Sequence, residues 1–165
     1  MVDEEMLIRP YSVADAEAVN AIALAAFAQY NGVFDDLDAL TCGVGAMASL
    51  ADYAELIVAE DDNRPVGAVG YMGPGTTPRA DFFDPAWGLV RMLVVHPGAR
   101  GKGIGRKLTD ECVARAQRDN APVLALHTSP VMEVALRMYL KMGFRLSRPL
   151  PNRFGVPYAL YVMHL

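Results

Sequence analysis

Cysteine is scarce in this sequence, and its two cysteines fit no pattern that carries chemistry. Cys42 and Cys112 are the only cysteines among 165 residues, and neither belongs to a Cys-x-x-Cys or cysteine–histidine spacing. A disulfide framework and a metal site are therefore not expected. We interpret both residues as reduced, partly buried thiols.

Long apolar runs are also missing. The most apolar run, from Ala21 to Ala28, is far shorter than the ~20 residues that a membrane-spanning helix needs. The amino terminus, Met1 to Glu5, is acidic, whereas a secretory signal peptide begins with positive charge. We therefore expect a soluble cytoplasmic protein that does not associate with membranes.

Positive charge is in deficit. Lys and Arg number 15 against 19 for Asp and Glu, which gives a formal net charge of −4. Binding to nucleic acid normally rests on a surplus of positive charge. We therefore expect no nucleic-acid partner.

The apolar residues suffice for one hydrophobic core. Hydrophobic residues make up 53% of the sequence and charged residues 21%, which is typical of a globular protein rather than a disordered one. The length is close to that of one domain, and there is no repeat or linker. We expect a single domain over residues 1–165.

Hydrophobic periodicity and turn residues predict alternating strands and helices. The expected strands cover 6–9, 56–59, 66–72, 87–95, 123–126, 144–147 and 157–164. The expected helices cover about 13–30, 36–50, 104–119 and 130–142. Ser12 and Asp15 resemble a capping box, Pro130 suits a first helical turn, and Gly143 suits a helix end. The last two strands are expected to be joined by a loop that contains Pro149, Pro151, Asn152 and Gly155. These elements predict a mixed α/β domain.

A glycine-rich loop, Gly98 to Gly105, lies between an apolar strand and a helix. Glycines let backbone N–H groups converge on one point, and the start of a helix adds further N–H groups. Four basic residues fall in the same stretch, namely Arg100, Lys102, Arg106 and Lys107. A phosphate or pyrophosphate is the ligand that this arrangement favours.

Two well-known phosphate motifs do not fit this loop. A Walker A loop would place a lysine after Gly103, where Ile104 stands. A Rossmann fingerprint would place its third glycine at Arg106 or Leu108. The pattern that does fit is Arg/Gln-x-x-Gly-x-Gly/Ala, with Arg100, Gly103 and Gly105.

With this motif the chain resembles the GNAT superfamily of N-acetyltransferases. The resemblance is strongest from Trp87 to Phe144, and it rests on four segments: Met92–Pro97, Arg100–Gly105, Ala135–Tyr139 and Gly143–Phe144. It implies a single acetyltransferase domain with a mixed, mostly antiparallel sheet of about seven strands and about four helices. It also implies that the fourth and fifth strands splay apart.

The resemblance implies that acetyl-CoA binds between the splayed strands. The pantetheine arm would bind the unpaired backbone groups of the fourth strand, as an added strand would. The pyrophosphate would bind the amides of residues 101–106, and an N–H of Leu93 or Val94 would polarise the thioester carbonyl. The implied cofactor-binding residues are Met92, Leu93, Val94, Val95, Arg100, Gly101, Lys102, Gly103, Ile104, Gly105, Arg106, Ser129 and Met132. At Met132 many members of the family have an asparagine.

The resemblance also implies direct attack of an amine on the thioester. Tyr139 matches the family's general acid, which protonates the leaving thiolate; without the motif, Tyr139 would be interpreted as a core aromatic. Many members have a glutamate as base where this chain has Leu89. His127 and Asp84 are the candidates to replace it, with a water chain to bulk solvent as the alternative.

The acceptor site is implied to lie among aromatic residues of the first helices and two loops. The candidates are Phe27, Tyr30, Phe83, Trp87 and Phe154. Asp81 or Asp84 would attract a cationic amine, so a small amine or a peptide is the expected acceptor. Homodimers are common in the family, so a homodimer is expected. The alternative function is a non-catalytic acyl-CoA-binding module, which the lost carboxylate at Leu89 and the replacement at Met132 would favour.

Overall fold

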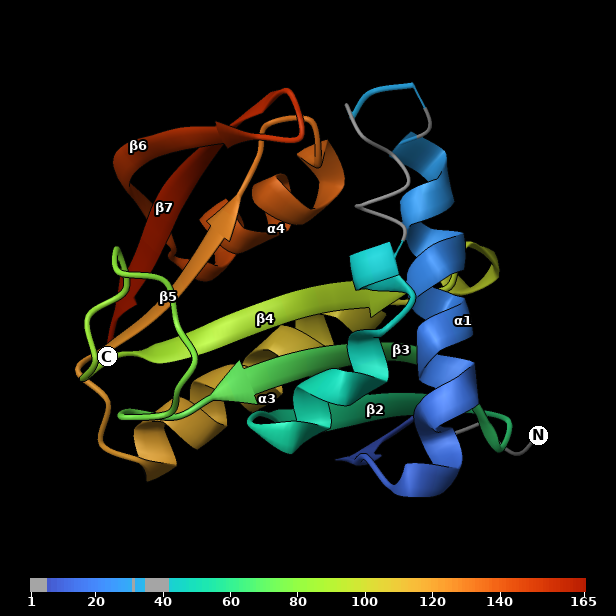
Figure 1. Cartoon of the computed structure of the whole chain (residues 1–165). Helices are drawn as coiled ribbons and strands as arrows, with labels where there is room; N and C mark the ends of the chain where they lie inside the picture. The colour runs from blue at the N-terminus through green and yellow to red at the C-terminus, as the bar shows by residue number, and fades with distance from the viewer. Residues whose placement is uncertain (1–5, 31, 35–41) are drawn as a thin grey trace.

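A seven-stranded sheet forms the centre of the protein, shown as a computed structural model in Figure 1. The structure describes residues 6–30, 32–34 and 42–165. In chain order the strands are β1 Leu7–Pro10, β2 Glu55–Asp61, β3 Arg64–Met72, β4 Gly88–Val95, β5 Val123–Thr128, β6 Arg145–Arg153 and β7 Val156–His164. Their order across the sheet is β1-β2-β3-β4-β5-β7-β6. β4 and β5 are the parallel pair, and the other neighbours are antiparallel.

Helices cover both faces of the sheet (Figure 1). The α-helices are α1 Ala16–Phe27, α3 Ile104–Arg118 and α4 Glu133–Met142, and 3-10 helices cover Val13–Asp15, Ala28–Tyr30, Met47–Asp52 and Pro97–Ala99. α1 packs against β3, β4 and the 3-10 helix Met47–Asp52, whereas α3 packs against β2 to β5. No helix in residues 6–30, 32–34 or 42–165 is long and apolar enough to cross a membrane.

Alternating strand residues divide the interior into two cores. On β2, Leu56 and Val58 join the core beneath α1, whereas Ile57 and Ala59 join the core beneath α3 and α4. This is the two-residue period of a sheet that is covered on both faces. The i, i+4 stripe predicted for α3, from Ile104 through Leu108 and Cys112 to Ala116, is wholly buried.

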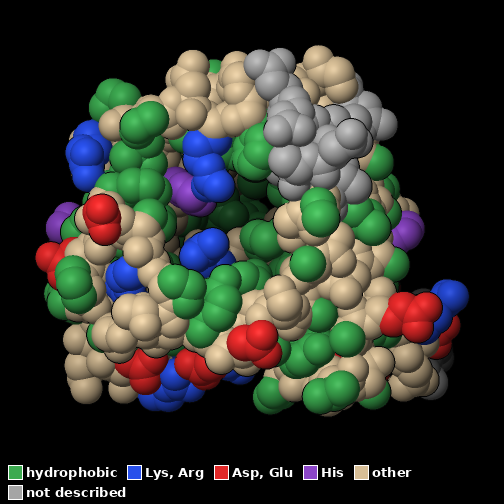
Figure 2. All heavy atoms as spheres, viewed as in Figure 1, with side chains coloured by type: hydrophobic (Ala, Val, Ile, Leu, Met, Phe, Trp, Pro, Cys, Tyr) green, Lys and Arg blue, Asp and Glu red, His purple; other side chains and the backbone are tan. Residues whose placement is uncertain are grey.

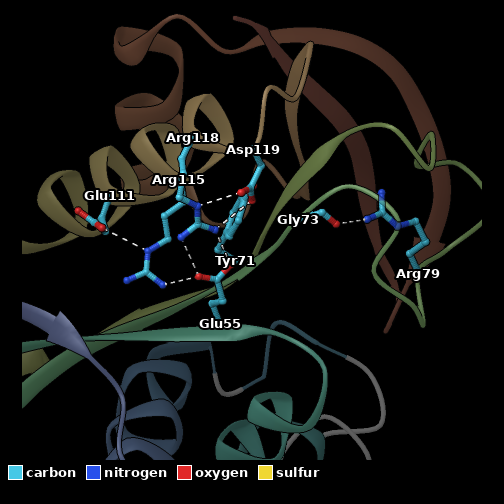
Figure 3. Close-up of polar contacts among 8 residues, drawn as sticks. All are labelled: Glu55, Tyr71, Gly73, Arg79, Glu111, Arg115, Arg118 and Asp119. Carbon is cyan, nitrogen blue, oxygen red and sulfur yellow. Dashed lines mark hydrogen bonds and ion pairs between the residues drawn. The ribbon is translucent and has the colours of Figure 1, made fainter.

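Polar contacts fasten the end of α3 to the sheet (Figure 3). The Tyr71 hydroxyl donates to Asp119 at 2.8 Å, and Arg118 binds both Asp119 and Glu55. Arg115 bridges Glu55 and Glu111, at 3.0 and 3.2 Å. α3, whose first turn follows the glycine loop, is therefore fixed at its far end to β2 and β3.

The loop between β3 and β4, residues 73–87, is organised around one arginine. The Arg79 guanidinium donates to the carbonyl oxygens of Gly73, Thr76, Asp84 and Trp87 at 2.8 to 3.0 Å, and Figure 3 shows its contact with Gly73. Backbone carbonyls that no strand pairs are thus satisfied by a side chain. The loop has a fixed shape, and it holds Phe82 and Phe83 against β5.

Several expectations from the sequence need correction. α4 begins at Glu133 and not at Pro130, which lies in the preceding turn. The expected loop between the last strands is a turn at Phe154-Gly155, because β6 runs on to Arg153 and includes both prolines as an edge strand can. Cys42 is exposed, whereas Cys112 is buried. The helix expected over 36–50 lies partly outside the described residues; within them, residues 42–44 are α-helical and Met47–Asp52 is a 3-10 helix.

Other expectations are confirmed. Ser12 and Asp15 form the capping box ahead of α1. Gly143 ends α4 with a φ of 111°, a left-handed conformation that glycine favours. The mixed, mostly antiparallel sheet of seven strands is the predicted architecture, and the structure identifies β4 and β5 as its parallel pair.

Candidate functional site

β4 and β5 separate partway along their length. They pair only at Gly88 with Leu124 and at Leu89 with Ala125. Beyond this point β4 remains paired to β3, and β5 to β7, on their other edges. Figure 1 shows the two strands starting side by side and then diverging. Backbone groups from Val90 and Leu126 onward therefore face the opening without a strand partner, as the predicted splay requires.

A bulge in β4 lies at this opening. Met92 has a φ of 53°, and the register between β3 and β4 shifts between Ala68 and Gly70. Bulges change the direction in which neighbouring groups of a strand point, and they are common beside active sites. Here the bulge brings Met92 and Leu93 to the wall of a cavity.

One cavity of about 380 Å³ lies over the glycine loop, and we call it the glycine-loop cavity. Gly101 and Gly103 have φ values of 83° and 74°, and Gly103 caps α3. Positive φ values at such glycines are typical of loops whose N–H groups, together with those of a following helical turn, converge on an anion. The predicted cofactor-binding residues that line the cavity are Leu93, Val94, Val95, Arg100, Gly101, Gly103, Ile104, Gly105, Arg106 and Met132.

Three predicted cofactor residues lie elsewhere. The Lys102 ammonium forms an ion pair with Asp61 at 3.0 Å. Ser129 is fully buried, and its hydroxyl accepts a hydrogen bond from the Val131 N–H at 3.4 Å. Met92 lines the second cavity.

The second cavity, of about 430 Å³, is the histidine cavity, named for His127 on its wall. Phe27, Leu93, Met132 and Ala135 line both cavities, so the two adjoin across β4. Figure 2 shows the hollow on this face, with basic and histidine side chains at its rim and apolar side chains within it. A ligand held by the glycine loop can therefore reach the histidine cavity through the opening between β4 and β5.

Tyr139 of α4 lines the histidine cavity. It packs edge-on against Phe144, with ring centroids 5.5 Å apart, and the described residues give its hydroxyl no hydrogen-bond partner. Burial raises the pKa of Tyr139 well above its usual value. The hydroxyl therefore stays protonated and can donate to a ligand.

His127 of β5 lies among aromatic rings. Phe82, Phe83 and Tyr158 surround it, with centroids 5.5 to 5.7 Å from the imidazole. Burial, followed by the charges of Arg153 and Arg91, lowers the pKa of His127 to about 4. The imidazole is therefore neutral at neutral pH, and its basicity is low while both arginine charges face it without a counter-charge.

Two arginines share the histidine cavity with His127. Arg91 lies on β4, and its guanidinium contacts the Met72 sulfur at 3.6 Å. Arg153, at the end of β6, lies over the rings of Phe154 and Tyr158 at 5.7 and 5.5 Å. Burial lowers the pKa of Arg91. Among the described residues that line this cavity there is no aspartate or glutamate.

The predicted acceptor residues divide into two groups. Phe27 and Phe154 line the histidine cavity, and Tyr30 lines the glycine-loop cavity. Phe83 is buried behind His127, and Trp87 belongs to the loop that Arg79 organises. Asp84 is exposed in that same loop, where its carboxylate caps the Ala86 N–H at 2.8 Å. Neither cavity is lined by Phe83, Trp87 or Asp84.

Sequence reasoning missed the two arginines. Arg91 could have been found as the one charged residue in the apolar strand Gly88–Val95. Arg153 was assigned to a loop, and nothing in the sequence places it opposite His127, because β6 and β5 do not pair directly.

Comparison with known proteins was made by sequence and by structure. Residues 52–146 match the family model described as an acetyltransferase (GNAT) domain. A search of curated proteins by sequence finds no match.

Solved acetyltransferases share the fold across nearly the whole chain. The PaiA N-acetyltransferase of Thermoplasma acidophilum, solved with coenzyme A, is 16% identical with a TM-score of 0.71, and the match covers 98% of this chain and 99% of that one. A GNAT acetyltransferase of Brucella melitensis, solved with acetyl-CoA, is 20% identical with a TM-score of 0.67, covering 98% and 89%. The ribosomal-protein-alanine N-acetyltransferase of Brucella melitensis is 24% identical with a TM-score of 0.69, covering 96% and 99%.

Proposed function

The chain belongs to the GNAT acetyltransferase domain family, and from this premise we propose that it transfers the acetyl group of acetyl-CoA to a primary amine of a small molecule or peptide. One observation carries the proposal: the glycine-loop cavity and the histidine cavity meet where β4 and β5 separate. The glycine-loop cavity has the loop conformation that is typical of anion-binding sites, and the histidine cavity has a protonated tyrosine and a neutral histidine on its wall.

The glycine-loop cavity fits the cosubstrate on its own geometry. The amides of residues 101–106 and the positive end of α3 would bind the pyrophosphate, with Arg100 and Arg106 beside them. The free edge of β4 from Met92 to Val95 would hold the pantetheine arm by backbone hydrogen bonds. Acetyl-CoA supplies an activated thioester, whose carbonyl oxygen an N–H of Leu93 or Val94 would stabilise.

Tyr139 would act as the general acid. As the amine nitrogen bonds to the acetyl carbon and the carbon–sulfur bond breaks, the Tyr139 hydroxyl would give its proton to the departing sulfur. Its place on the wall of the histidine cavity and its raised pKa support this role.

His127 would receive the proton that the amine loses, directly or through a water molecule. It is the histidine of the cavity wall, whereas Asp84 lies in the exposed part of the loop between β3 and β4. Leu89, at the position of the usual family glutamate, has no group that can accept a proton, and it is fully buried in the core.

The test is release of free thiol from acetyl-CoA across a panel of amines. We expect release that depends on the amine and a matching N-acetyl product by mass spectrometry. The buried Leu89 favours a second candidate, an acyl-CoA-binding module without turnover. Tight acetyl-CoA binding without release from any amine would select that candidate, and no binding would contradict both.

A further inference from the structure

We infer that the acceptor amine also carries a carboxylate, that Arg91 and Arg153 bind this carboxylate in the histidine cavity, and that the rest of the acceptor is apolar. A free amino acid with an apolar side chain has this chemistry. The inference rests on the proposed acetyl transfer and names its substrate class.

Arg91 is a half-buried cation whose hydrogen-bonding groups are mostly unused. A guanidinium has five N–H donors, and the contact recorded for Arg91 within the described residues is a long one to the Met72 sulfur, a weak acceptor. Burial also lowers the pKa of Arg79, but the Arg79 guanidinium donates to four carbonyl oxygens. A buried charge without a partner is costly. An anionic ligand would supply the partner that Arg91 lacks.

Arg153 is held in place but has no counter-charge among the described residues. The rings of Phe154 and Tyr158 support its guanidinium, and its Nη1 lies 3.2 Å from the His127 Nε2. The positive charge of Arg153 lowers the pKa of both Arg91 and His127. Two cations that repel one another across a cavity form a natural site for a carboxylate, because guanidinium groups match its two oxygens.

The remaining wall of the histidine cavity is mostly apolar. The apolar and aromatic residues that line it from α1, the segment 44–53 and the β6–β7 turn are Phe27, Val44, Met47, Leu50, Tyr53 and Phe154. A volume of about 430 Å³ is in the range of pockets for small molecules.

A carboxylate in this position would also assist the chemistry. In an α-amino acid the amine is two bonds from the carboxylate carbon, so binding at Arg153 brings the amine near His127. The negative charge would offset Arg153 and Arg91, which both lower the pKa of His127. Binding of the correct acceptor would therefore make His127 a better proton acceptor.

The experiment compares phenylalanine with its amide and with phenethylamine, using thiol release and kcat/KM. We expect phenylalanine to exceed both by about 10- to 100-fold, the range for hydrogen bonds to charged groups. At neutral pH the amide, whose amine is less basic, has more of that amine in the neutral, nucleophilic form, so protonation alone would favour the amide over phenylalanine. Phenylalanyl-glycine, whose carboxylate is farther from its amine, should also be poorer. Equal or reversed values for the amide would overturn the inference, and an equally good dipeptide would overturn the restriction to free amino acids.

Arg91→Gln and Arg153→Gln identify the residues responsible. Each should lower the phenylalanine-to-amide ratio of kcat/KM toward one. Both variants also remove a charge that lowers the pKa of His127, but a change in the basicity of His127 alone would act on both substrates and would not by itself remove the preference for phenylalanine. Arg148→Gln, an exposed arginine of β6 outside both cavities, is the matched control. A ratio that survives in both variants would overturn the assignment.

A binding measurement separates this inference from the proposed function. Calorimetry with the CoA-bound protein compares phenylalanine and its amide without turnover. If no amine releases thiol but phenylalanine binds preferentially and Arg91→Gln abolishes the preference, acetyl transfer fails and the carboxylate site stands. If thiol is released without any preference for carboxylates, the carboxylate site fails and acetyl transfer stands.

Discussion

The Arg153 Nη1 atom lies 3.2 Å from the His127 Nε2 atom. A guanidinium nitrogen can only donate, so we assign the accepting lone pair to Nε2 and the imidazole proton to Nδ1. Nδ1 is buried and has no hydrogen-bond partner in the structure. The neutral imidazole is thus held in one tautomer, with its basic nitrogen turned toward the arginine at the cavity.

The first prediction concerns the pKa of this histidine, which is lowered to about 4 by burial and by Arg153 and Arg91. Arg153→Gln removes one positive charge and should raise the pKa of His127, whereas the control Arg148→Gln should leave it unchanged. NMR titration of the imidazole carbon-bound protons measures both. An unchanged pKa in Arg153→Gln would show that the recorded contact does not persist in solution.

The second prediction concerns Tyr139. Tyr139→Phe removes the hydroxyl but not the ring, so the packing against Phe144 remains. We expect kcat to fall about 100-fold, the lower end for general acid catalysis, while the Kd for acetyl-CoA stays unchanged. Because burial raises the pKa of Tyr139 above its usual range, the alkaline limb of the wild-type pH profile should not come from this residue.

Tyr161→Phe is the control for Tyr139→Phe. Tyr161 is also a buried tyrosine of the same core, but it lines neither cavity. A similar loss of kcat in both variants would contradict an acid role for Tyr139 and indicate damage to the core instead.

The third prediction concerns the salt bridge between Arg9 and Asp15, at 2.8 Å. The hydrogen bond from Arg9 lowers the pKa of Asp15 from 3.8 to about 2. Between these values the unfolded chain binds more protons than the folded one, so the free energy of unfolding should fall as the pH drops from about 4 to about 2. Asp15→Asn should reduce this free energy at pH 7 by about 2 kcal/mol and flatten its acid dependence.

Asp110→Asn provides the comparison for Asp15→Asn. Asp110 pairs with Arg106 at 3.2 Å, but both side chains are more than half exposed, so the pair should contribute little. Urea denaturation at pH 7 and at lower pH measures both variants. An equal, small loss in both would contradict the role given to the Arg9–Asp15 pair.

Features of the fold and the site that depend on residues close together in the sequence could be predicted, whereas features that depend on residues far apart in the sequence could not. The glycine loop, the α3 stripe and Gly143 depend on neighbouring residues, and the sequence alone placed them correctly. The turn at Phe154-Gly155 was missed because Pro149 and Pro151 are typical of loops, yet an edge strand tolerates them. The meeting of Arg91, Arg153 and His127 depends on three strands that are far apart in sequence, and no local pattern reports it.

The fourth prediction concerns Arg79. Arg79→Ala removes one donor from each of four carbonyl oxygens of the loop 73–87, of which those of Gly73 and Asp84 keep a backbone N–H donor. The variant should lower the free energy of unfolding by about 1 to 3 kcal/mol. Because this loop holds Phe82 and Phe83 against His127, the KM for the amine should rise. The Kd for acetyl-CoA, which the glycine loop sets, should not change. A variant that loses affinity for acetyl-CoA as well would show general unfolding rather than a local role.

The last prediction concerns Gly103, which caps α3 with a φ of 74°. A Cβ at this position would meet no atom within 4 Å, so Gly103→Ala introduces no clash, and its cost comes from the left-handed backbone alone. That cost is about 1 to 2 kcal/mol, which the loop can relieve by turning its N–H groups away from the anion site. We expect the Kd for coenzyme A, measured by calorimetry, to rise about 10-fold.

Gly75→Ala isolates the contribution of the anion site. Gly75 has nearly the same conformation, with a φ of 78° and no atom within 4 Å of a Cβ, but it lies in the loop between β3 and β4. The two variants should lose similar stability, because the same backbone penalty applies to both. Only Gly103→Ala should lose affinity for coenzyme A, since only Gly103 lies at the start of α3, where the N–H groups of the loop and the first helical turn would bind the pyrophosphate. An equal loss of affinity in both variants would mean that binding follows overall stability, and the glycine loop would then lose its assignment as the pyrophosphate site.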